Sequence, residues 1–355
     1  MIMNKAIVQQ RAFSASFGFT VLLAAASLTS PVAAAEKELS SCSGIKDDAE
    51  RLACYDRAAG RQAPSSAELP LETKPAPVPS ENGSSSKSLL SERWELDDAD
   101  KHGIFAMRAH LPTFLLPFHY TNSSNDRPDS PTHSDPGGVA RDYRNTEVKF
   151  QLSFKAKIAQ RVLFDSADVW FGYTQQSLWQ VYNKKQSAAF RETNYEPEVM
   201  LVVPTDYSLA GLRGRLFSVG VVHQSNGQAD PRSRSWNRVY TQIGLERGNF
   251  ALLLRPWWRL PENPATDDNP DIEDYIGRGE IIALYRYGEQ QWAMQVRNNF
   301  RSSDNRGSVK LTWNYPFVAG LKGYVELFSG YGETLIDYNH RQNTIGLGIS
   351  LIEWM

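Results

Sequence analysis

The feature that most constrains this fold is a two-residue alternation of apolar and polar side chains, sustained over long stretches. Between residues 147 and 158 the even positions are apolar, and the odd positions are charged or polar. Side chains two residues apart share one face of a strand. The pattern therefore predicts a long strand with one apolar and one charged face. The apolar face holds Val148, Phe150, Leu152, Phe154, Ala156 and Ile158, and the other holds Glu147, Lys149, Gln151, Ser153, Lys155 and Lys157.

The same alternation recurs at residues 291–297, 309–317 and 345–351, in segments separated by loops rich in Asn, Asp, Gly and Pro. These segments last about ten residues, which matches a tilted membrane strand of roughly 9–11 residues better than a soluble strand of about 5–6. We expect an all-β transmembrane barrel. Aromatic residues near the segment ends are expected to form girdles at the two membrane interfaces. They are Trp257, Trp258, Trp313, Tyr315, Phe317 and Trp354.

The amino-terminal part of the chain predicts export. Residues 1–35 combine a basic start, an apolar stretch and small residues up to Ala35, which is typical of a signal peptide cleaved after that residue. Cys42 and Cys54 are the only cysteines, and we expect them to be paired because exported proteins mature in an oxidising compartment. Residues 36–60 then form a small helical module, residues 61–95 a Pro/Ser-rich linker, and residues 96–355 the barrel. No later segment is a candidate transmembrane helix, and residues 36–90 are expected to be periplasmic.

The net charge of the chain and the placement of its charged residues give information about binding partners and about the barrel interior. A net charge of −2 and a pI near 6.3 give no reason to expect nucleic-acid binding or docking to anionic lipid. The charged strand faces are expected to form a network that fills the barrel interior rather than to line a transport path. Glu147, Lys149, Lys155, Arg238 and Glu246 are the residues expected there.

Candidate catalytic residues lie in the run from residue 217 to residue 245. His223 and Ser225 continue an apolar strand face, and a hairpin symmetric about Asp230 places Asn237 directly opposite His223. Directly opposed residues have Cβ atoms roughly 4.5–5.5 Å apart. The three side chains suit a nucleophile, a base and a group that orients the base. Their apolar neighbours suggest a site that faces lipid.

Several strings in this chain resemble the outer-membrane phospholipase A family. The likeness covers about residues 100–355 in order. It includes residues 190–197 (FRETNYEP), 223–227 (HQSNG), 230–238 (DPRSRSWNR), 266–271 (TDDNPD), 329–333 (SGYGE) and 335–339 (LIDYN). The resemblance implies a twelve-stranded antiparallel barrel in the cell outer membrane. It also implies phospholipase A1 and A2 activity, which is hydrolysis of the sn-1 and sn-2 acyl esters of phospholipids and lysophospholipids.

The resemblance also implies roles for individual residues. Ser225 matches the family's nucleophile, His223 its general base and Asn237 the residue that orients the imidazole. An uncharged third member stabilises the imidazolium less than Asp would, so a bound Ca²⁺ is expected to help lower the barrier at the oxyanion.

The resemblance further implies about one Ca²⁺ per monomer in an active homodimer. The matching ligands are Ser233, Gln228, and Ser187 from across the dimer interface, with Asp268 a further calcium residue and Asp230 a weaker match. Gln228 departs from the family's Arg, but its contact is through the backbone carbonyl. Gln175 matches a polar residue of the interface.

Other interpretations remain open from the residues alone. A His and a Ser on an apolar strand face are more often packed residues than catalytic ones. Residues 267–271 also fit a solvated acidic loop, and residues 227–231 fit simple turn chemistry. A non-catalytic outer-membrane barrel, either a channel or a structural protein, is the main alternative function, and an exported soluble esterase is the second. Head-group preference is not predicted.

Overall fold

The computed structural model describes residues 42–58, 88–133, 140–187, 190–318 and 320–355. The chain divides into two compact units, residues 1–80 and 81–355, which are described separately. The helices are α2 (Asp48–Ala58), α3 (Leu89–Trp94), η1 (Asp98–Asp100), α4 (Val162–Asp165) and α5 (Ile272–Ile276). The strands are β1 (Met107–Ala109), β2 (Thr113–Thr121), β3 (Thr146–Arg161), β4 (Ala167–Trp179), β5 (Glu192–Leu209), β6 (Leu212–Ser225), β7 (Ser235–Arg247), β8 (Phe250–Arg259), β9 (Gly279–Tyr287), β10 (Gln290–Asn298), β11 (Gly307–Val318), β12 (Leu321–Gly330) and β13 (Gln342–Ile352).

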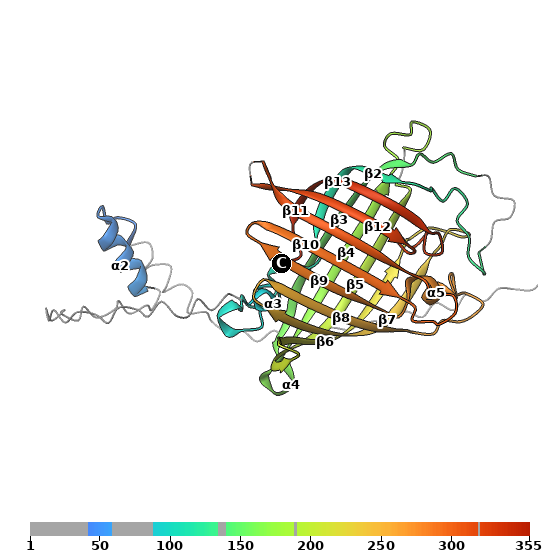
Figure 1. The fold of residues 1–355 in the computed structure, drawn as a ribbon. Coiled ribbons are helices and arrows are strands. Elements are labelled where there is room, and N and C mark those ends of the chain that lie inside the picture. The colour runs from blue at the N-terminus through green and yellow to red at the C-terminus, as the bar shows by residue number, and fades with distance from the viewer. Residues whose placement is uncertain (1–41, 59–87, 134–139, 188–189, 319) are drawn as a thin grey trace, which may run out of the picture. The chain divides into compact units, whose positions relative to one another are not determined.

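The second unit is a closed antiparallel barrel (Figure 1). Strands β2 to β13 pair in chain order, and β13 pairs with β2 to close the ring. The short β1 pairs with β3 beyond the point where β2 begins, so β1 and β2 together occupy one position in the ring. They are separated at Pro112, which has no N–H to donate to a ladder. The ring therefore holds twelve strands, which confirms the expected fold.

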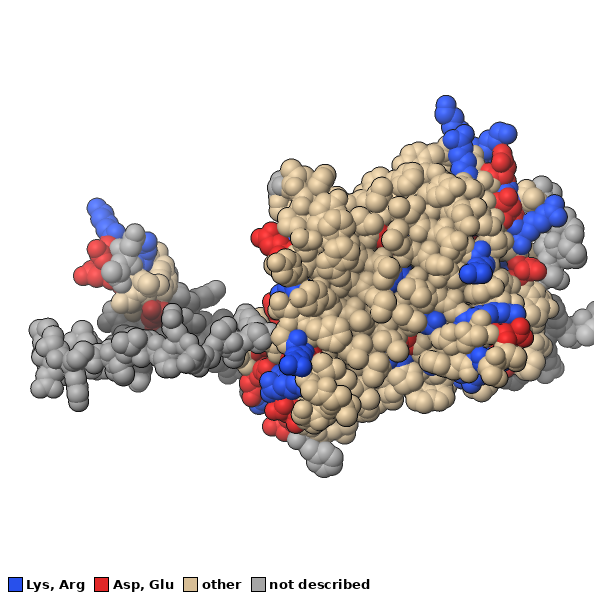
Figure 2. Space-filling view, viewed as in Figure 1, with Lys and Arg blue, Asp and Glu red and all other residues tan. Residues whose placement is uncertain are grey.

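The polarity of the barrel is inverted relative to that of a soluble protein. Along β3 the odd positions are buried and the even positions face outward, so Lys149 is 0% exposed whereas Leu152 is 50% exposed. Much of the outer surface over the strands carries no charge (Figure 2). An apolar outer surface around a polar interior is the arrangement that lipid requires. Among the described residues, no helix is long and apolar enough to cross a membrane.

Charged side chains fill the interior as expected. The Lys149 ammonium lies 2.6 Å from Glu326 and 2.9 Å from Glu333. Glu147, Arg238 and Glu246 are also buried and each contacts an opposite charge. Lys155 differs, because its Nζ lies 3.2 Å from the centre of the Trp94 ring and has no hydrogen-bond partner in the part of the chain that the structure describes. A cation over an indole face is stabilised by the ring quadrupole.

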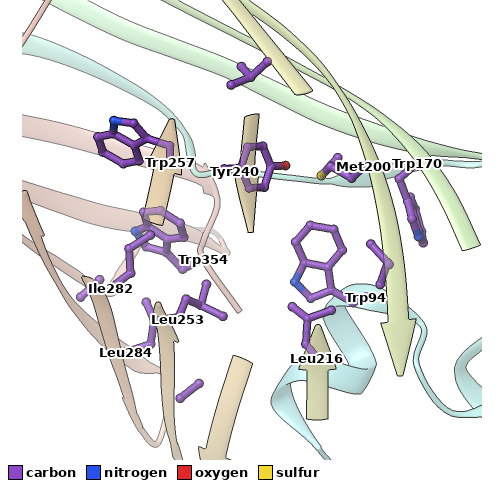
Figure 3. Close-up of a cluster of buried hydrophobic side chains, with 14 of the residues drawn as sticks. Trp94, Trp170, Met200, Leu216, Tyr240, Leu253, Trp257, Ile282, Leu284 and Trp354 are labelled. Carbon is purple, nitrogen blue, oxygen red and sulfur yellow. The ribbon is translucent and has the colours of Figure 1, made fainter. Parts of the chain in front are cut away.

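Helix α3 lies inside the barrel unit rather than in a linker. Leu89, Leu90 and Trp94 are buried in the main apolar cluster, where Trp94 lies near Trp170 and Leu216 (Figure 3). The Leu90 amide donates to Glu246 at 3.0 Å. The expected boundary at residue 95 therefore differs from the structure. The Pro/Ser-rich composition before residue 88 favours a linker that extends to residue 95, but the barrel interior buries three apolar residues of that segment. Residues 61–87 lie outside the described residues.

Two of the six aromatic residues expected in the girdles face inward. Trp257 is 3% exposed and belongs to the internal apolar cluster, whereas its neighbour Trp258 is 56% exposed. Adjacent residues on a strand point to opposite faces, so only one of this pair can meet lipid. Trp354 follows the end of β13 and is also buried internally, with its amide bonded to Gln291 at 2.9 Å. The girdle assignment is wrong for these two residues.

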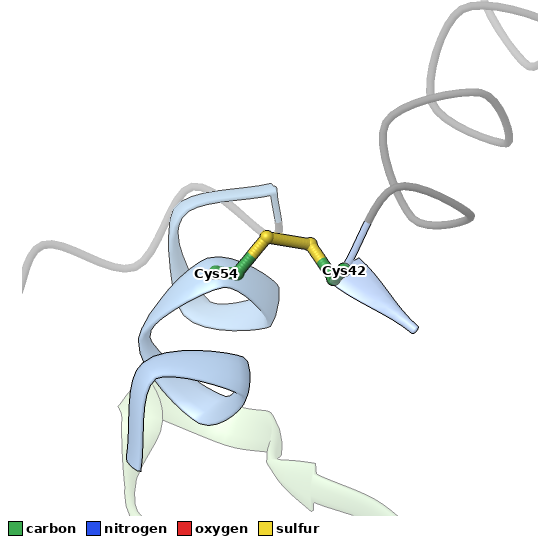
Figure 4. The surroundings of a disulfide bond; sticks show 2 residues. All are labelled: Cys42 and Cys54. Atoms are coloured by element: carbon green, nitrogen blue, oxygen red, sulfur yellow. A yellow bond between two sulfur atoms is a disulfide. The ribbon is translucent and has the colours of Figure 1, made fainter. Parts of the chain in front are cut away.

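The first unit contains helix α2 and the disulfide between Cys42 and Cys54, which confirms the expected pairing (Figure 4). The Asp47 side chain accepts a hydrogen bond from the Glu50 amide at 3.0 Å and so caps the start of α2. The expected signal peptide, residues 1–35, lies outside the described residues.

Candidate active site

The hairpin of β6 and β7 brings His223 and Asn237 together. The two residues are direct register partners, which confirms the predicted symmetry about Asp230. His223 Nδ1 lies 2.9 Å from Asn237 Oδ1. Because an amide oxygen only accepts hydrogen bonds, this contact requires that Nδ1 carry the proton. Nε2 of the neutral imidazole is then free to accept a proton.

The site lies on the outer surface of the barrel, as expected. Val219 and Val221 precede His223 on the same face of β6 and are 36% and 51% exposed, while Ser218 and Val222 on the opposite face are buried. His223 is exposed and Ser225 is half-buried on that same face, two residues apart at the loop end of the strand. Among the described residues, His223 is joined to Asn237 but not to Ser225, whose Oγ forms no hydrogen bond to His223 Nε2 or to any other group.

Asn237 has a second polar contact that the sequence pattern did not indicate. Its Nδ2 donates to Glu262 Oε1 at 3.4 Å, so the amide lies between the imidazole and a carboxylate. Glu262 lies in the loop after β8. Burial, reinforced by Asp267 and opposed by Arg259, raises the pKa of Glu262 above its ordinary value. An amide held from both sides has only one orientation that satisfies both partners, with the oxygen toward His223.

The loops beside this hairpin bring together two of the four predicted calcium ligands. Ser233 Oγ donates to Asp268 Oδ2 at 2.7 Å, and Ser235 Oγ donates to the same oxygen at 3.3 Å. His133 Nε2 lies 3.1 Å from Asp230 and 3.9 Å from Asp268. Ca²⁺ takes oxygen ligands, so the Ser233 hydroxyl and the carboxylates of Asp230 and Asp268 fit the ion, whereas the His133 nitrogen does not.

The other two predicted ligands are placed differently. The Gln228 side chain turns to Glu192 at 2.5 Å and accepts from Arg232 at 2.7 Å, so only its backbone carbonyl is available to a cation. Ser187 lies in the loop between β4 and β5, where its carbonyl accepts from Trp179 at 3.0 Å. Within the described part of the chain, no hydrogen bond joins Ser187 to Ser233 or Asp268. That placement is compatible with a ligand that serves a second subunit.

Comparison with known proteins identifies the family. Residues 90–351 match the family model described as Phospholipase A1. Phospholipase A1 of Klebsiella pneumoniae is 41% identical over 60% of this chain and 72% of its own length. A Neisseria meningitidis serogroup B protein, provisionally named as a phospholipase A1, is 38% identical over 87% of this chain and 89% of its own length.

Solved structures agree with this match. Outer membrane phospholipase A from Escherichia coli is 34% identical, with a TM-score of 0.64 over 72% of this chain and 95% of its own. The Salmonella typhi outer membrane phospholipase dimer, solved with bound calcium, gives the same TM-score of 0.64 at 34% identity over 71% of this chain and 94% of its own. The chain therefore belongs to the phospholipase A1 family of outer-membrane β-barrels, which are carboxylic ester hydrolases.

Proposed function

We propose that this protein is a calcium-dependent phospholipase that hydrolyses the sn-1 and sn-2 acyl esters of phospholipids and lysophospholipids at the membrane surface. Ser225 is the nucleophile, His223 the general base and Asn237 the residue that orients the base. The observation that carries the proposal is the 2.9 Å contact between His223 Nδ1 and Asn237 Oδ1 on the outer face of the barrel. A site on that face meets lipid without requiring the substrate to leave the membrane.

The chemistry begins with proton transfer to His223. As Ser225 Oγ attacks the ester carbonyl, Nε2 takes the hydroxyl proton, and Asn237 holds the ring with Nδ1 protonated. Nε2 then gives the proton to the glycerol oxygen as the tetrahedral intermediate collapses, which releases the lysophospholipid and leaves an acyl-serine. Water, deprotonated by the same Nε2, then hydrolyses the acyl-serine to free fatty acid and Ser225.

Calcium is the proposed cofactor, held by Ser233, the Gln228 carbonyl and Ser187 of a second copy, with Asp268 supporting the site. When bound, the ion would supply positive charge that stabilises the developing oxyanion. The Ser233–Asp268 contact of 2.7 Å supports a shared position for the two oxygen ligands. The calcium-bound dimer of the Salmonella typhi relative supports the same cofactor and assembly.

A homodimer is the proposed active form. Among the described residues Ser187 forms no hydrogen bond to Ser233 or Asp268 of its own chain, and in this proposal Ser187 of a second copy completes the site. Gln175 lies on the outer face of β4, where the only hydrogen bonds of its amide to described residues are to Tyr173 at 3.2 Å and Ser177 at 3.4 Å. Lipid offers little hydrophobic drive for association, so an amide pair across the interface is a suitable contact.

Replacing Ser225 with Ala tests the catalytic assignment. Purified protein in uncharged detergent micelles, assayed on a phospholipid with saturating calcium, is expected to lose at least about a thousandfold in kcat. Ser329→Ala is a control, since Ser329 is an exposed serine on β12 whose hydroxyl donates to Asn343 and to none of the site residues. Unchanged hydrolysis by the Ser225→Ala variant would remove Ser225 from the mechanism. If hydrolysis persists undiminished after calcium chelation, Ca²⁺ is not a cofactor of the reaction.

A non-catalytic channel is less well supported. The barrel interior holds the ion pairs around Lys149 and the apolar cluster that buries Trp94, so a channel would have to displace both.

A further inference from the structure

A cleft of about 420 Å³ opens beside the catalytic hairpin on the loop end of the barrel. Tyr195 and Asn226 form the wall nearest to the site. Tyr195 is the register partner of Ser225 on β5, and Asn226 follows Ser225 in the chain. The cleft therefore begins at the residues that flank the proposed nucleophile.

Four basic side chains line this cleft, which we call the basic cleft, and none of the described residues that line it is a carboxylate. They are Arg141, Lys185, Arg191 and Arg232. The charge of Arg191 is balanced, because it lies 3.0 Å from Glu147 and 3.0 Å from Asp337. The other three have no such balance among the described residues. The cleft therefore carries positive charge in excess.

The positive charge of Arg232 is not neutralised by the groups that it contacts. Its guanidinium bonds to neutral acceptors, which are Gln228 Oε1 at 2.7 Å, the Tyr143 hydroxyl at 3.1 Å and the Arg191 carbonyl at 3.3 Å. These bonds fix the position of the group without neutralising it. Arg141 and Lys185 are exposed and take part in no salt bridge within the described residues. One held cation and two exposed ones therefore line the same cleft.

We propose that the basic cleft binds the phosphate group of the substrate phospholipid while the ester carbonyl lies at Ser225. This inference rests on the proposed function and adds a head-group preference to it. Guanidinium and ammonium groups are the side chains that best bind phosphate oxygens. Phosphate-bearing esters are therefore favoured over neutral acylglycerols with the same chains, and lipids with a net negative head group are favoured over zwitterionic ones.

Lys185 and Lys184 provide a matched pair for the test. Both are exposed and adjacent in sequence, but only Lys185 lines the cleft. In uncharged micelles at saturating calcium, Lys185→Gln is expected to raise KM for a phospholipid by about two- to fivefold. The Lys185→Gln, Arg141→Gln double variant is expected to raise it by roughly tenfold. Hydrolysis of a neutral diacylglycerol with the same chains stays unchanged in both, and Lys184→Gln changes neither substrate.

Three results would overturn the cleft assignment. Equal losses on phospholipid and diacylglycerol would indicate general damage to the active site. Equal effects of Lys184→Gln and Lys185→Gln would indicate long-range attraction to phosphate rather than a binding site. An unchanged KM in the double variant would indicate that the cleft binds no phosphate.

A binding measurement separates this inference from the proposed catalysis. The Ser225→Ala protein is titrated in uncharged micelles with an ether-linked phospholipid, which cannot be hydrolysed, and with an ether-linked dialkylglycerol that lacks phosphate. Tighter binding of the phosphate-bearing lipid, lost on Lys185→Gln but not on Lys184→Gln, supports the cleft even if Ser225 proves not to be the nucleophile. Equal binding of the two ether lipids contradicts it even if catalysis is confirmed.

Discussion

Asn237→Asp is the substitution whose outcome depends most directly on the contacts found at this site. The new carboxylate would still face His223, where the amide oxygen now lies 2.9 Å from Nδ1. Its second oxygen would replace the Nδ2 that donates to Glu262 at 3.4 Å. The favourable contact between residue 237 and the Glu262 carboxylate thereby becomes a repulsion between two carboxylates. Glu262→Gln is expected to relieve this repulsion.

The size of this repulsion follows from the distance. Two unit charges 3.4 Å apart repel by about 1 kcal/mol in a water-like medium and by about 5 kcal/mol at an effective dielectric constant near 20. Glu262 is only half-buried, so the lower figure applies. About 1 kcal/mol corresponds to roughly a fivefold change in a rate constant.

A double-mutant cycle on kcat/KM measures the coupling. The native protein, Asn237→Asp, Glu262→Gln and the double variant are assayed on one phospholipid at saturating calcium. Glu262→Gln is expected to improve the Asn237→Asp protein by about fivefold more than it changes the native protein. Asp304→Asn is the control, because it removes an exposed carboxylate from another loop that has no contact with Asn237. Heat-modifiable migration verifies that every variant is folded.

Additive effects would refute this reasoning. If Glu262→Gln changes kcat/KM of the native and the Asn237→Asp proteins by the same factor, to within about twofold, the side chains of residues 237 and 262 do not interact. The Asn237 amide would then be oriented by His223 alone.

Four further outcomes are expected. Burial alone would raise the pKa of Glu333, but Lys149 and His119 outweigh it and hold that pKa well below 4.5. Its stabilising effect is therefore complete above pH 4.5 and lost as the pH falls through the folded-state value. Urea unfolding in micelles should show Glu333→Gln less stable by about 3–5 kcal/mol at neutral pH, with the gap narrowing in acid. Trp94→Ala should cost about 3–5 kcal/mol in the same assay, because it empties a buried site. Cys42→Ser should leave hydrolysis and barrel unfolding unchanged, since the disulfide belongs to the other unit. Ser187→Trp should lower turnover and calcium affinity while the barrel stays folded, and full activity in that variant would contradict the shared calcium site.

Local periodicity accounts for what the sequence predicted well. Alternation along β3 identified which side chains meet lipid, because strand geometry alone sends successive residues to opposite faces. The pairing of His223 with Asn237 followed from the symmetry of one hairpin, which is also a local property. The twelve strands and the roles of the site residues came from family resemblance rather than from periodicity.

Residues beyond the strands were harder to predict. Trp354 was expected at the interface, yet it packs inside, because it follows the last strand and no alternation governs it. Helix α3 was assigned to a linker because its local composition resembles its neighbours. What buries Leu90 is the closed barrel, which no short window of sequence contains.

The sequence by itself determined the inward and outward faces of alternating strands such as β3, the disulfide and the opposition of His223 to Asn237. Tertiary structure alone decided which loops meet above the barrel. Closure of the ring brings Glu262 to Asn237 and three unbalanced cations to one cleft. The physical reason is that strand faces repeat every two residues, whereas contacts between loops depend on the register of every strand around the ring.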